Sequence, residues 1–73
     1  MSREELLCDI TGRVWKVEKP VGSQVAEGDT VIVVESMKME IPVAATTAGQ
    51  ITELRVKEGD EVSEMQVIAV INS

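Results

Sequence analysis

The residues best suited to chemistry form one short run near the middle of the chain. They are Glu35, Ser36, Met37, Lys38, Met39 and Glu40. One lysine stands between two methionines, and that triplet stands between two carboxylates. Lys38 offers a primary amine on a long flexible stem, which becomes a nucleophile once it loses a proton. In most proteins such a triplet is only a solvated lysine beside methionines that fill a core.

The groups that would make this lysine a catalyst are missing from the sequence. A lysine amine is largely protonated at neutral pH, and the chain has no histidine to take the proton. The neighbouring Glu35 and Glu40 favour the charged amine. We therefore expect Lys38 to be a substrate for another enzyme, and we do not expect an independent enzyme.

The composition indicates a small domain with few kinds of chemistry open to it. The chain has 73 residues, which we interpret as one domain over 1–73, and 44% of them are apolar, without Phe or Tyr. One cysteine and no histidine exclude a metal site and Ser-His-Asp or Cys-His catalysis.

A formal charge of −6 argues against binding to nucleic acid, and no apolar run is long enough to span a membrane. The lone Cys8 and the lack of a secretory signal over Met1 to Glu5 favour the cytoplasm. We expect a monomer in isolation.

The elements that must position the lysine belong to an internal repeat. Gly12 matches Gly49, an offset of 37 residues, and the same offset pairs further apolar and glycine positions without a gap. These pairs are Val14 with Ile51, Val17 with Leu54, Gly22 with Gly59, Val25 with Val62, Val31 with Ile68 and Val33 with Val70. A periodic self-match of this kind indicates two similar structural units, here related by a pseudo-twofold axis.

The strand pattern is satisfied by an all-β domain of two four-stranded antiparallel sheets, each with strands from both halves. Four β-branched residues, 31–34, favour a strand over residues 30–35. The offset aligns Leu6 with Val43 and Cys8 with Ala45, so we expect a strand over residues 5–9 and a buried, unreactive Cys8. We expect the sole aromatic, Trp15, to pack in the core; contact with a partner is the alternative.

The run 35–40 resembles the biotin-attachment motif of biotinyl domains, the carrier modules of biotin-dependent carboxylases. That motif has Glu, then Ala or Ser, then Met-Lys-Met. The likeness covers nearly the whole chain, including residues 22–29, Ala44-Ala45, Gly49 and residues 57–60. It implies a flattened barrel-sandwich with Lys38 at a hairpin tip, biotin attached to Lys38 as an amide, and recognition of the flanking residues by a biotin protein ligase.

The resemblance also implies the partners and leaves an alternative cofactor open. Biotin on Lys38 would accept carboxylate at a biotin carboxylase and deliver it at a carboxyltransferase. Lipoyl domains are similar in fold but usually have Asp before the lysine and Ala after it, so Met37 and Met39 argue against lipoate. A lipoyl or dual carrier, and an unmodified interaction module, are the competing hypotheses. The chain departs from the family at Asp9-Ile10, where Pro-Met is frequent, and at Met65, where glycine is common.

Overall fold

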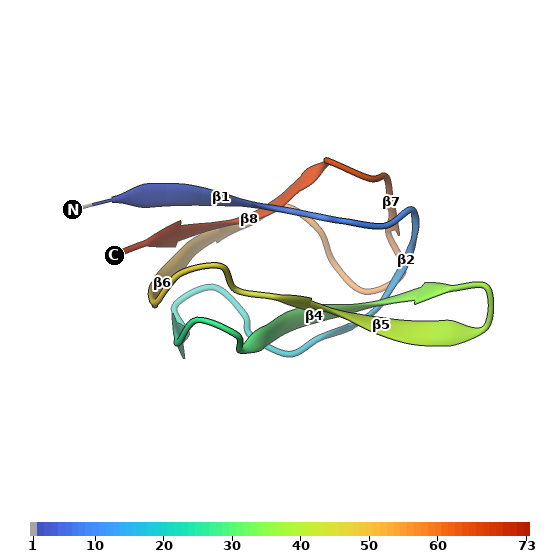
Figure 1. Cartoon of the computed structure of the whole chain (residues 1–73), viewed down its shortest axis with the longest axis horizontal. Helices are drawn as coiled ribbons and strands as arrows, with labels where there is room; N and C mark the ends of the chain where they lie inside the picture. The colour runs from blue at the N-terminus through green and yellow to red at the C-terminus, as the bar shows by residue number, and fades with distance from the viewer. Residues whose placement is uncertain (1) are drawn as a thin grey trace.

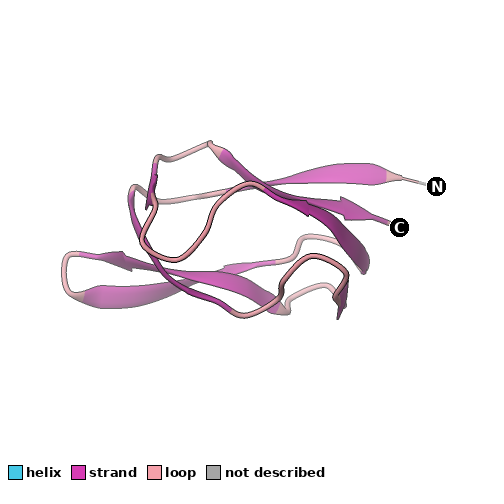
Figure 2. Cartoon of the chain, turned by 180° about the vertical axis from the view of Figure 1, so that it is seen from behind, coloured by secondary structure: helices cyan, strands magenta, loops and turns pink. Residues whose placement is uncertain are grey.

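Eight strands and no helix make up residues 2–73, the part of the chain that the computed structural model describes. They form two four-stranded antiparallel sheets, one above the other (Figure 1). The terminal sheet contains, in order, β1 (Arg3–Leu7), β8 (Val67–Asn72), β6 (Gly49–Leu54) and β3 (Gln24–Val25). The hairpin sheet contains β5 (Met39–Ala44), β4 (Thr30–Ser36), β2 (Gly12–Val17) and β7 (Glu61–Val62). The predicted fold is confirmed, and Figure 2 shows strands joined only by loops.

The predicted internal repeat is present in the strands, in their pairing registers and in the turns. In the hairpin sheet Val14 pairs with Val34, and in the terminal sheet Ile51 pairs with Ile71. The turn bonds recur as well: Ala26 N–H donates to Asp29 Oδ2 at 2.9 Å, and Ser63 N–H donates to Gln66 Oε1 at 2.9 Å. The two halves therefore form the same β-unit twice.

Apolar side chains from both sheets fill the space between them. Strand alternation directs side chains such as Val14 and Ile51 inward, and together with consecutive buried residues of β4 and β8 they form one buried cluster. Its largest members include Leu6, Val14, Ile32, Val34, Ile51, Ile68 and Ile71. Cys8 is fully buried there, as predicted, and its thiol donates a hydrogen bond to the Ile10 carbonyl at 2.9 Å.

Gly12 and Gly49 occupy equivalent places where the backbone of a neighbouring strand passes very close. A Cβ on Gly12 would lie 2.5 Å from the Glu35 carbonyl oxygen, and one on Gly49 would lie 2.6 Å from that of Asn72. Close approach of strands is therefore the reason for glycine at both positions.

The chain ends meet at the end of the molecule opposite the β4–β5 hairpin (Figure 1). Ser2 and Ser73 exchange two backbone hydrogen bonds, with N to O distances of 3.1 and 2.8 Å. At the repeat offset they correspond to Met39 and Ser36, the pair that closes the hairpin. The hairpin tip and the chain ends are thus pseudo-symmetric ends of a body 37 Å long.

Two predictions need correction. The first strand covers Arg3–Leu7, not residues 5–9, because its pairing with β8 begins at Arg3 and Asn72 and reaches a bulge at Leu7. Trp15 does not pack in the core, since 49% of its surface is exposed. Trp15 follows the inward-facing Val14, so strand alternation directs its side chain outward, and a β-bulge between Val14 and Lys16 leaves it without a partner on β4.

Candidate functional site

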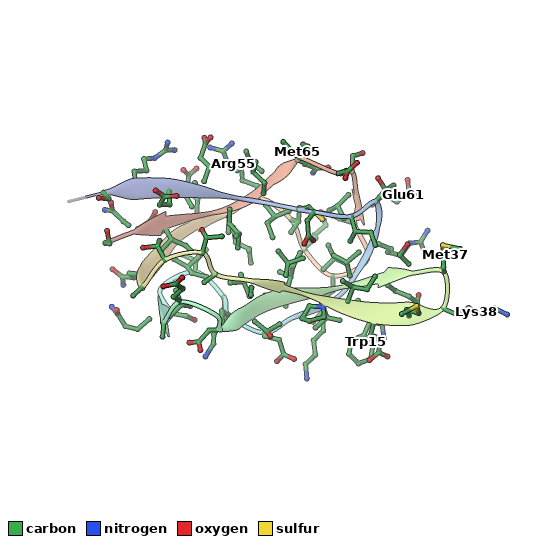
Figure 3. The ribbon with its side chains drawn as sticks, in the orientation of Figure 1. Trp15, Met37, Lys38, Arg55, Glu61 and Met65 are labelled. Atoms are coloured by element: carbon green, nitrogen blue, oxygen red, sulfur yellow. The ribbon has the colours of Figure 1, made fainter. Side chains whose placement is uncertain are left out.

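Lys38 lies at the outermost point of the β4–β5 hairpin, as predicted. The last strand pair joins Ser36 to Met39, so Met37 and Lys38 form a two-residue loop. Both side chains are exposed, Met37 to 92%, and Figure 3 shows the Lys38 amine pointing away from the body of the domain. An enzyme can therefore reach the amine without any rearrangement of the fold.

The tip backbone has a conformation that its residues do not favour. Met37 has φ of 53° and Lys38 has φ of 65°, both in the left-handed region. Two-residue hairpin loops with positive φ at both positions normally contain Asn-Gly or a similar pair. Non-glycine residues in this region cost about 1 kcal/mol or more each. The paired strands β4 and β5 must hold the tip in this shape, and this fixes the direction in which Lys38 leaves the loop.

The two flanking carboxylates face each other across the hairpin. Glu35 on β4 pairs with Glu40 on β5, and both side chains are exposed. Within residues 2–73, neither carboxylate has a cation within 4.0 Å. Like charges directly opposite each other destabilise a sheet. Their pseudo-symmetric equivalents, Asn72 and Arg3, carry no such repulsion. The hairpin end of the domain therefore has a local electrostatic cost that the other end lacks.

The remaining motif residues lie beside the tip. Ser36 is half-buried, and Met39 is 62% exposed. The structure thus brings all six predicted residues together at one end of the hairpin sheet.

A shallow hollow of about 410 Å³ adjoins the tip, and the sequence analysis did not identify it. Arg13 and Glu61 line it, and their side chains form an ion pair of 3.6 Å between Nη2 and Oε2. Its other lining residues are Thr11, Gly12, Glu35, Ser36, Met37, Val62 and Ser63. Charged Arg13 and Glu61 replace neutral Gln50 and Gln24 of the other half, a difference that comparison of the two repeats could have found.

The described part of the chain contains no cluster of three or more metal-ligating side chains. None of its elements is a helix long and apolar enough to cross a membrane. The Lys38 amine is the exposed nucleophilic group at the tip, and Ser36 beside it is half-buried.

Comparison with known proteins places these features in a family. The family described as "Biotin-requiring enzyme" matches residues 8–71. The chain is 41% identical over 64 residues to the biotin/lipoyl attachment protein of Bacillus subtilis, covering 88% of each chain. It is 39% identical over 69 residues to the biotinylated protein TB7.3 homolog of Mycobacterium leprae, covering 94% of this chain and 97% of that protein.

A solved structure shows the same architecture. The chain superposes on part of the crystal structure of the Kluyveromyces lactis urea carboxylase with a TM-score of 0.91 and 40% sequence identity. The match covers 99% of this chain and 6% of the carboxylase. One β-sandwich of this kind therefore occurs both as a small protein and as a short segment of a large one.

Proposed function

The chain belongs to the biotin-requiring enzyme family and is a biotinyl carrier domain, and from that premise we propose that Lys38 is its attachment site. The observation that carries the proposal is the position of the Lys38 amine, exposed at the strained tip of a rigid hairpin. Lys16, Lys19 and Lys57 do not lie at a hairpin tip of this kind. They remain unmodified under this proposal.

The domain can carry covalent biotin on Lys38, but it has no residues that would attach the biotin by themselves. No described group is placed to take the proton from the Lys38 amine. A biotin protein ligase must therefore remove the proton and activate the biotin carboxyl group. The amide that forms is neutral, which makes the net charge of the domain more negative by one.

The flanking residues act in recognition by the ligase. Met37 and Met39 offer flexible apolar surface that can fill a pocket in the ligase. Glu35 and Glu40 offer two carboxylates to basic side chains, and Ser36 closes the hairpin beside them. These residues therefore present the lysine and do no chemistry themselves.

Once attached, biotin supplies the ring nitrogen that accepts and gives up a carboxyl group. The domain holds this group at the end of the Lys38 side chain, on the far side from Ser2 and Ser73. We propose that the whole chain, 1–73, acts as one carrier that visits a biotin carboxylase and then a carboxyltransferase. A reducing compartment, the cytoplasm, fits its single buried cysteine, Cys8.

The alternative cofactor is lipoate, because one relative at 41% identity is named a biotin/lipoyl attachment protein. The test is a side-by-side time course in which purified apo-protein meets biotin ligase or lipoate ligase, read by intact mass. We expect biotinylation to be much the faster reaction. Comparable rates would replace this proposal with a dual carrier.

A variant at the tip sharpens the comparison. Met37→Asp places a charge next to Lys38, and burying that charge in a pocket suited to methionine costs free energy. We expect this variant to narrow or reverse the preference for biotin. Because residue 37 is almost fully exposed, thermal unfolding should show that the fold is retained.

A further inference from the structure

Trp15 is the one large side chain of the hairpin sheet whose place the proposed function does not explain. It lies on β2 and points away from the terminal sheet (Figure 3). Its closest neighbours on the outer face of the sheet follow from the register, in which Lys16 pairs with Val33 and Val33 pairs with Pro42. Val33 faces outward because Ile32 and Val34, on either side of it, belong to the core. Trp15, the half-buried Val33 and the exposed Pro42 therefore lie on one outer surface, with Lys16 opposite Val33, and we call this surface the Trp15 face.

The pseudo-symmetric surface of the terminal sheet differs at the positions equivalent to Trp15 and Pro42. Its central residue, Val70, is only 1% exposed although it stands outside the core cluster. Charged side chains surround it, and Arg3 pairs with Glu5 at 3.8 Å and with Glu53 at 3.2 Å. Arg55 pairs with Glu53 at 3.6 Å. At the repeat offset, Arg55 and Glu53 correspond to the Glu18 and Lys16 pair of the hairpin sheet. Thr52 and Glu5, in contrast, stand where the Trp15 face has Trp15 and Pro42.

The terminal sheet shows what the fold itself requires of the outer face of such a sheet. Both outer faces cover the same kind of sheet, with the same register and the same bulge. Thr52 occupies the bulge position of the terminal sheet, and the fold accepts it there. An exposed indole at the corresponding position is thus not a demand of the fold. Aromatic residues of this kind are enriched where proteins bind one another and often dominate the binding energy.

We propose that the Trp15 face is the surface on which biotin protein ligase docks when it modifies Lys38. The inference rests on the proposed function and adds to it the surface by which the partner holds the domain. Trp15 is a contact residue in this account, and it takes no part in the chemistry at the amine.

The distance from Lys38 to Trp15 favours the ligase, over the carboxylase and the carboxyltransferase, as the partner that contacts the Trp15 face. The register places Trp15 level with Val33 and Val34, four to five residues from the tip, or roughly 15 Å at about 3.3 Å per residue. A standard interface covers about 800 Å² per partner, a disc of roughly 16 Å radius, so one centred on Lys38 extends to Trp15. The ligase must bring its active site to the lysine amine itself. An enzyme that acts on the biotin ring binds a group that lies beyond the Lys38 amine. The surface around its active site therefore need not contact the sheet.

Charge identifies the kind of surface that the ligase presents. Glu35 and Glu40 lie between Trp15 and Lys38 and repel each other without a cation within 4.0 Å among the described residues. Of the cations nearby, Arg13 is occupied by Glu61 at 3.6 Å and Lys16 by Glu18 at 3.9 Å. The complementary surface is an apolar hollow for the indole with basic side chains on the side toward the active site.

The test compares initial rates of biotinylation of apo-protein by a bacterial biotin protein ligase. Trp15→Thr installs the residue that the fold already accepts at position 52. We expect its kcat/KM to fall about 10-fold, the size typical of the loss of an aromatic contact, while Trp15→Phe keeps most of the wild-type value. Val21→Thr is the matched control, because Val21 is an apolar residue that is 58% exposed, against 49% for Trp15, and lies in a loop away from the tip. Its kcat/KM should equal that of the wild type.

Several outcomes would overturn the proposal. One is an unchanged kcat/KM in Trp15→Thr, whether or not carboxylation of the biotinylated variant is impaired. Another is a wild-type dimer in sedimentation that dissociates in Trp15→Thr, which would assign the face to a second copy. Thermal unfolding of each variant shows whether it is folded at the assay temperature, so a lower rate with an intact fold supports docking. Absence of biotinylation in the wild type itself would instead refute the proposed function.

Discussion

The hairpin tip should become more stable when it loses its function. Replacing Met37 by Asn and Lys38 by Gly gives the sequence that this loop prefers, since φ is 53° and 65° at the two positions. Relief of left-handed strain contributes about 1 to 2 kcal/mol per residue. The greater freedom of glycine in the unfolded chain removes roughly 0.5 to 1 kcal/mol of that gain. The two positions together would gain about 2 to 4 kcal/mol before the glycine term is subtracted, so we expect the free energy of unfolding to rise by about 1 to 3.5 kcal/mol.

Urea unfolding followed by circular dichroism measures this change directly. The midpoint should move to higher urea with an unchanged slope, because the surface exposed on unfolding stays the same. In a thermal scan, each kcal/mol corresponds to roughly 4 to 8 °C for a domain of this size. The rise should therefore be easy to resolve.

A matched variant separates strain relief from a general effect of Asn and Gly. Thr46→Asn with Thr47→Gly places the same pair in another loop, where neither residue has positive φ. We expect that variant to be as stable as the wild type or less stable. An equal rise in both variants, or a fall in the tip variant, would refute the view that the tip is strained.

Two further predictions concern residues that break the symmetry of the repeat. Met65 has φ of 73° where the first half has Gly28, so Met65→Gly should raise the free energy of unfolding by about 0.5 to 1 kcal/mol. Biotinylation should not change, and a lower midpoint in urea would contradict the assignment of strain to Met65. Glu40→Gln removes the repulsion with Glu35 and should raise stability by roughly 0.2 to 1 kcal/mol. The same variant should lower kcat/KM for the ligase. A rate equal to that of the wild type would show that the ligase does not recognise the Glu40 carboxylate.

The repeat explains why so much of the fold is predictable from the sequence. Val14 and Ile51 match at the offset and occupy the same register in their sheets, so one half of the chain predicts the other. The position of Cys8 was likewise predicted from its match with Ala45, and both are buried. These cases depend on alternation and burial, which the pattern of apolar residues records directly.

The errors arise where residue chemistry or backbone geometry runs against that pattern. Trp15 looks like a core residue by its chemistry, but it follows the inward-facing Val14 and therefore faces outward. The left-handed turn at Met37 and Lys38 is unmarked in the local sequence, because the pairing of β4 with β5 imposes it on residues that prefer other conformations. The ion pair of Arg13 with Glu61 joins residues far apart in the chain and needs the packed structure to be seen.

The most direct test of the account is the site and number of biotin groups on the protein. Wild type, Lys38→Arg and the exchange variant Met37→Lys/Lys38→Met are each incubated with biotin, ATP and biotin protein ligase, then measured by intact mass and peptide mapping. We predict one biotin on the wild type, located on Lys38, and essentially none on either variant, because the hairpin presents one position only. Biotin on Lys16, Lys19 or Lys57, or undiminished labelling of the exchange variant, would contradict the claim that the shaped tip selects Lys38.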